Sequence, residues 1–61
     1  MTNAEIEIIE QMYKELFYIA LYTGKCENEL DYMIRLMDRL ELTKLRLNIE
    51  NECIINYLEG K

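Results

Sequence analysis

The stretch that decides the fold runs from Asn28 to Leu58 and reads NELDYMIRLMDRLELTKLRLNIENECIINYL. It contains no glycine and no proline, the two residues that most often interrupt a helix. Its apolar residues recur at intervals of three and four, which is the spacing of a buried helical face. The pattern therefore predicts one long helix over about residues 28–58.

A shorter helix is predicted upstream, over about residues 3–22. Its start is marked by Thr2-Asn3-Ala4-Glu5, which matches the T-x-x-E capping box. Its end is marked by Gly24, because glycine favours the left-handed conformation just past a helix. Since a short connection makes neighbouring helices antiparallel, we expect an all-α helical hairpin, with residues 1–61 forming a single domain.

The two predicted helices differ in length, and the difference predicts self-association. At about 1.5 Å per residue, the first would be about 28 Å long and the second about 46 Å. The long helix beyond about Leu47 would lack an intramolecular partner, so we expect a homodimer that forms a four-helix bundle. The residues predicted to make this contact are Leu40, Leu47, Ile54, Ile55 and Leu58.

An alternative is that the long helix is broken and its end folds back as a third helix. The chain would then bend near Thr43 or within residues 48–51, although neither glycine nor proline favours a bend there. Asn51 also has two interpretations. It is either a polar residue that fixes the register of a helix seam, or a residue at the solvent boundary.

A second contact surface, for an unidentified protein partner, is predicted from two further groups of residues. One is an aromatic patch at the end of the first helix, where tyrosine is also compatible with a half-exposed position. The other is an apolar stripe on the long helix, displaced from the self-association residues by roughly half a turn. The predicted partner-binding residues are Tyr18, Leu21, Tyr22, Leu42, Leu45, Ile49 and Cys53.

Composition argues against several kinds of partner and compartment. The net charge is −5 and the seven basic residues are scattered, whereas nucleic-acid binding needs a concentrated basic face. No apolar run reaches the 18 or so residues that span a membrane, so we expect a cytoplasmic protein that binds neither membranes nor nucleic acid. Cys26 and Cys53 are expected to be free thiols, because about 40 Å would separate them on one continuous helix.

The residue types that most enzymes need are missing. The chain contains no serine and no histidine, so Ser–His and Cys–His nucleophile pairs cannot form within it. Two distant cysteines do not supply a zinc site, and the acidic cluster of Glu27, Glu29 and Asp31 lacks the spacing of a calcium loop. We therefore expect no enzymatic activity, no metal and no cofactor.

One motif carries a resemblance to a known family. Glu27-Asn28-Glu29-Leu30-Asp31, followed by Ile34, resembles the S-Q-E-L-D-x-L-I signature of the small sporulation aspartyl-phosphate phosphatases of spore-forming bacteria. Glu27 and Asn28 stand where that family has Ser and Gln. The resemblance implies a short two-helix hairpin that acts on a phosphorylated response regulator, with Glu29 and Asp31 as the residues to test.

These observations favour a small, acidic, non-enzymatic regulatory or adaptor protein that acts by binding other proteins and itself. The alternatives are an inhibitor of a host protein complex, carried by a phage or mobile element, and the phosphatase just described. The preference for Ile, Asn, Glu and Tyr is typical of AT-rich coding sequence, and so of a low-GC bacterium or its phage. A subunit of a larger helical assembly is a further possibility.

Overall fold

Three helices make up the computed structural model over residues 1–60, which are the residues that the structure describes. They are α1 (Asn3–Thr23), α2 (Glu27–Arg39) and α3 (Thr43–Glu59). The all-α class is confirmed, but the two-helix hairpin is wrong, because the stretch expected to form one long helix is divided into α2 and α3. The last residue of the domain predicted over 1–61 lies outside the described residues.

The break between α2 and α3 is a Schellman turn built without glycine. Glu41 adopts a left-handed backbone conformation with φ of 61°. The Leu42 N–H donates to the Met37 carbonyl at 2.8 Å, and the Glu41 N–H donates to the Asp38 carbonyl at 3.1 Å. Leu42 also packs against the core that contains Met37, as the residue after such a turn commonly does. The alternative of a third helix that begins near Thr43 is therefore the one that the structure adopts.

The first helix follows its sequence signals closely. The Thr2 side chain accepts a hydrogen bond from the Glu5 N–H at 3.2 Å, and the Glu5 carboxylate accepts one from the Thr2 N–H at 2.9 Å. This reciprocal pair is the predicted capping box. At the other end Gly24 is left-handed, with φ of 72°, and its N–H donates to the Ala20 carbonyl. Both predicted ends of this helix are thus confirmed to within a residue.

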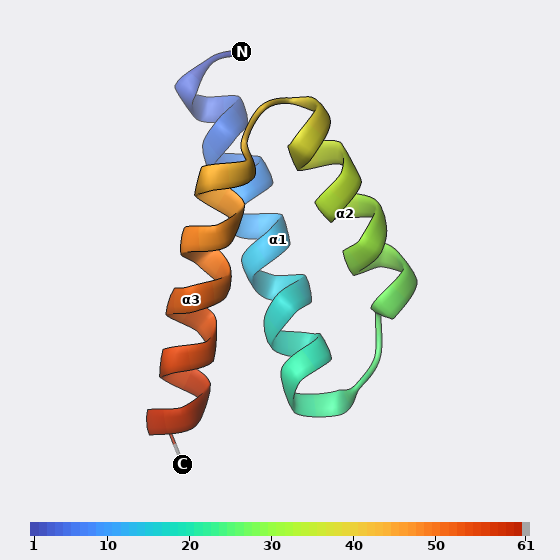
Figure 1. The fold of residues 1–61 in the computed structure, drawn as a ribbon, viewed down its shortest axis with the longest axis vertical. Helices are drawn as coiled ribbons and strands as arrows, with labels where there is room; N and C mark the ends of the chain where they lie inside the picture. Colours follow the sequence, from blue (N-terminus) through green and yellow to red (C-terminus); the bar gives the residue numbers. More distant parts are fainter. Residues whose placement is uncertain (61) are drawn as a thin grey trace.

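The helices alternate in direction, so that α1 and α3 run the same way and α2 runs opposite to both (Figure 1). The closest packing is between α1 and α3. Five residues drawn from the three elements form the buried centre over residues 1–60: Tyr13, Met33, Met37, Ile49 and Cys53. Because the turn at Glu41 returns α3 to α1, one apolar stripe of α3 is buried within the chain itself.

The long overhanging helix on which the dimer prediction rested does not exist, since α3 lies alongside α1 over its length (Figure 1). The four-helix-bundle homodimer stays a prediction, and it must now rest on apolar surface that the three-helix fold leaves exposed. No helix over residues 1–60 combines the length and hydrophobicity that crossing a bilayer requires.

Replacing Glu41 with glycine tests the turn. The substitution should raise the free energy of unfolding if residue 41 is left-handed, and lower it if residue 41 is inside a helix. A left-handed conformation costs an L-residue about 1–2 kcal/mol, so Glu41→Gly is expected to raise the free energy of unfolding by up to about 1 kcal/mol. In a continuous helix the same change would lower it by about 1 kcal/mol. Urea denaturation followed by circular dichroism measures the difference. Arg35→Gly, at an exposed position inside α2, is the matched control and should lower stability by about 1 kcal/mol.

Candidate interaction surface

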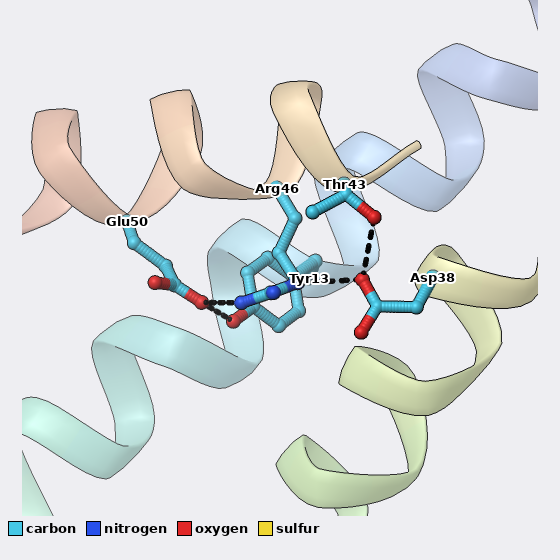
Figure 2. A network of polar contacts seen from close by, with 5 residues as sticks. All are labelled: Tyr13, Asp38, Thr43, Arg46 and Glu50. Carbon is cyan, nitrogen blue, oxygen red and sulfur yellow. Dashed lines mark hydrogen bonds and ion pairs between the residues drawn. The ribbon is translucent and has the colours of Figure 1, made fainter. Parts of the chain in front are cut away.

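One polar network joins the three helices close to the turn between α2 and α3 (Figure 2). The Tyr13 hydroxyl donates to Glu50 Oε2 at 2.5 Å, and Arg46 Nη1 donates to the same oxygen at 2.7 Å. Arg46 Nε also donates to Asp38 Oδ1 at 3.3 Å, and the Thr43 hydroxyl donates to that oxygen at 2.8 Å. The network thus links α1, α2 and α3 through side chains that bond one another.

The chemistry of this network is that of a structural clamp. Burial, and then the adjacent Glu50 carboxylate, raise the pKa of Tyr13 well above its ordinary value. Burial alone would lower the pKa of Arg46, but the interactions with Glu50, Tyr13 and Asp38 together outweigh it and raise the pKa. Tyr13 is therefore a neutral donor and Arg46 a fixed cation at neutral pH. Within residues 1–60, no buried side-chain nitrogen or oxygen is left without a partner.

The predicted aromatic patch is used partly within the chain. The Tyr18 hydroxyl accepts a hydrogen bond from Asn56 Nδ2 at 3.0 Å. Tyr22 packs edge-on against Tyr57, with 5.0 Å between ring centroids, and is nevertheless 61% exposed. Leu21 is half-buried against the core. These contacts, together with Lys14–Glu52 at 3.6 Å, fasten α1 to α3 along most of their length.

The predicted partner-binding stripe of α3 is turned inward. Ile49 is 2% exposed and Cys53 is fully buried, while Leu42 and Leu45 are half-buried against them. Their side chains pack within this chain and are not presented to a partner in this fold. Burial also raises the pKa of the Cys53 thiol, which makes it a poor nucleophile. Both thiols are free over residues 1–60.

The residues predicted for self-association are distributed differently. Leu40 is half-buried in the turn after α2. The other four lie on α3 with side chains between 40% and 60% exposed. With Asn51, which is also exposed, they form what we call the α3 outer face: Leu47, Asn51, Ile54, Ile55 and Leu58.

The α3 outer face carries no charge. Between Leu47 and Leu58 the charged residues are Glu50 and Glu52. Glu50 is held by Tyr13 and Arg46, and Glu52 pairs with Lys14 on α1. The face is therefore an apolar surface with one amide in it, on a protein whose net charge is −5.

Sequence reasoning missed a second apolar surface, between α1 and α2. A shallow groove there is lined mainly by Met12, Leu16, Tyr32 and Met33, and Ile8 extends the exposed apolar surface along α1. The exposed positions Ile8, Met12 and Ile19 do recur at helical spacing. They lie at the edge of the apolar face of α1, and α2 and α3 pack around Tyr13 and leave this edge exposed.

The acidic residues highlighted by the phosphatase resemblance lie at the start of α2. Glu29 and Asp31 are both exposed, and Asp31 pairs with Arg35 at 3.1 Å. No group of three or more potential metal ligands comes together within residues 1–60. Comparison of the chain with models of known protein families, with curated proteins and with solved structures found no match in any of the three.

The buried tyrosine predicts an alkaline loss of stability. Because its pKa is raised on folding, Tyr13 releases its proton more readily in the unfolded chain, whose tyrosine pKa is about 10. The free energy of unfolding is thus expected to be unaffected by this group below pH 10 and to fall as pH rises further. Tyr13→Phe should lose about 1–3 kcal/mol at pH 7 and show a shallower fall above pH 10.

Urea denaturation at half-unit steps from pH 8 to 11 measures both effects. Tyr22→Phe, which removes the hydroxyl of an exposed tyrosine, is the matched control and should follow the original chain. Equal alkaline slopes for the original chain and Tyr13→Phe would show that the Tyr13 hydroxyl is not held as described.

Proposed function

We propose that this protein is a small regulatory or adaptor protein that acts by binding other proteins and by self-association, without enzymatic activity. The observation that carries the proposal is the uncharged, apolar α3 outer face. Exposed apolar surface that is continuous along one helix is commonly an interaction site in soluble proteins. The clamp around Tyr13 supports a non-enzymatic role, because its ionisable groups are committed to holding the helices together.

The energy available from the α3 outer face fits weak, reversible association. Fully burying one leucine or isoleucine contributes about 1.5–3 kcal/mol. The four aliphatic side chains are already about half-buried, so covering them would contribute about 3–6 kcal/mol for each copy. Two copies together would gain about 6–12 kcal/mol, against an association cost of about 4–15 kcal/mol. At the favourable end of both ranges about 8 kcal/mol remains, so we expect a dissociation constant no lower than about 1 μM.

Weak self-association suits a regulator. A face that is only transiently covered by another copy remains available to a different protein at lower concentration. The folded monomer does not depend on this contact, because its core is made by Tyr13, Met37 and the inward stripe of α3. Self-association and partner binding would then compete for one surface, and concentration would decide between them.

The test is the solution mass of the chain over a dilution series, by sedimentation, with helicity followed in parallel. The original chain should shift from dimer to monomer without losing helicity. Leu47→Asp places a charge on the α3 outer face and should leave a folded monomer at every concentration, because Leu47 is 47% exposed. Ile19→Asp, the same kind of change on the exposed side of α1, is the matched control and should still dimerise.

Two results would oppose the proposal. A folded monomer at millimolar concentration would remove self-association. Dissociation caused by Ile19→Asp but not by Leu47→Asp would move the contact to α1.

A further inference from the structure

The α3 outer face has the heptad spacing of a coiled-coil seam. Leu47, Asn51, Ile54 and Leu58 follow one another at intervals of four, three and four residues, as the d and a positions of consecutive heptads do. Asn51 occupies an a position and is the one polar residue among these four. At about 1.5 Å per residue the seam is about 16 Å long.

Charge decides which occupant suits this seam. Two copies that each carry a net charge of −5 repel one another at long range, so they can pair only where neither presents unpaired charge. Between Leu47 and Leu58 the seam meets this condition, because Glu50 and Glu52 are engaged within the chain, and the exposed Lys44 lies one turn before it. A basic partner would find no carboxylate there to bind. The seam therefore fits a second copy of this chain better than a partner of opposite charge.

We infer that two copies pack α3 against α3 in parallel and in register, so that Asn51 of one copy meets Asn51 of the other. This inference rests on the proposed function, since it specifies the geometry of self-association. A side-chain amide contains both donors and an acceptor, so two amides facing each other across a two-fold axis satisfy one another. An asparagine at an a position is a known means of fixing register in parallel dimers.

The antiparallel arrangement is the competing geometry. It would place Asn51 opposite Ile54 of the second copy and Leu47 opposite Leu58. Each unpaired buried amide would then lower the association constant by about one to two factors of ten. The parallel arrangement has a smaller cost in association free energy. It brings Lys44 of one copy near Lys44 of the other, and these two positive charges repel. Lys44 is exposed and its long stem lets the ammonium reach water, where like charges cost less than a factor of ten.

Disulfide formation between introduced cysteines tests the orientation. The background is Cys26→Asn, because asparagine tolerates the left-handed conformation of Cys26, whose φ is 65°. Cys53 is fully buried and stays. In a parallel pair, α-carbon atoms facing each other across the seam are about 4–6 Å apart, within reach of a disulfide. Leu47→Cys chains should then link to one another under oxidising glutathione, whereas Ile19→Cys chains should not.

The antiparallel geometry gives the opposite result. The two copies of residue 47 would be about 16 Å apart, and crosslinks would form only when Leu47→Cys and Leu58→Cys chains are mixed. If crosslinks form only in that mixture, the parallel geometry is wrong, although the chain does self-associate through α3. A chain that sediments as a dimer but gives neither crosslink would show that α3 is not the contact. A chain that sediments only as a monomer would defeat the proposed function itself.

Replacing the amide provides an independent readout. Asn51→Leu should strengthen dimerisation at least tenfold, because it removes the polar group from the seam, and should allow both kinds of crosslink, because orientation is no longer specified. Asn48→Leu, beside the seam on the same helix, is the matched control and should retain crosslinking at residue 47 alone. If Asn51→Leu changes neither the dissociation constant nor the crosslinking pattern, Asn51 is not in the contact.

Discussion

The left-handed turn at Glu41 is the constraint on which the rest of this structure depends. Without it, α2 and α3 would form one rod, and only one side of α1 would be covered. With it, α3 returns along α1, and a single short chain closes a core around Tyr13 and Met37. The same reversal determines which apolar stripe of α3 is buried and which is left on the surface.

A network of side chains stabilises the turn against the cost of its left-handed residue. This clamp consists of Tyr13, Asp38, Arg46 and Glu50. A glutamate in a left-handed conformation costs energy that the surrounding contacts must offset. Asp38, at the end of α2, is bonded by both Thr43 and Arg46 of α3, so the two helices are tied across the break. Arg46 in turn orients the Glu50 carboxylate that receives the buried tyrosine hydroxyl (Figure 2). Turn and core are thus held by one continuous set of bonds.

Much of this could be foreseen from the sequence, and the failures have a common cause. The capping box at Thr2, the stop at Gly24 and the two stripes of α3 follow from local rules that need no knowledge of the fold. The break near Thr43 could be predicted only as an alternative, because the Schellman position that usually holds glycine holds Glu41. On one continuous helix, Met33, Leu47 and Ile54 would lie on the same side, whereas in the structure Met33 is buried in the core and the other two are exposed. Local sequence patterns identified the two apolar stripes of α3. Which stripe is buried and which is exposed depends on the chain reversal at Glu41.

The parallel pairing of α1 with α3 also governs the order in which the chain can fold. Tyr13 and Tyr18 find their partners, Glu50 and Asn56, 37 and 38 residues later. At a synthesis rate of about 5–20 residues per second, α1 waits about 2–8 seconds on the ribosome before its principal neighbour exists. During that interval its aromatic residues have only α2 to cover them. The contacts that hold Tyr13 and Tyr18 in place therefore form only after α3 has been synthesised.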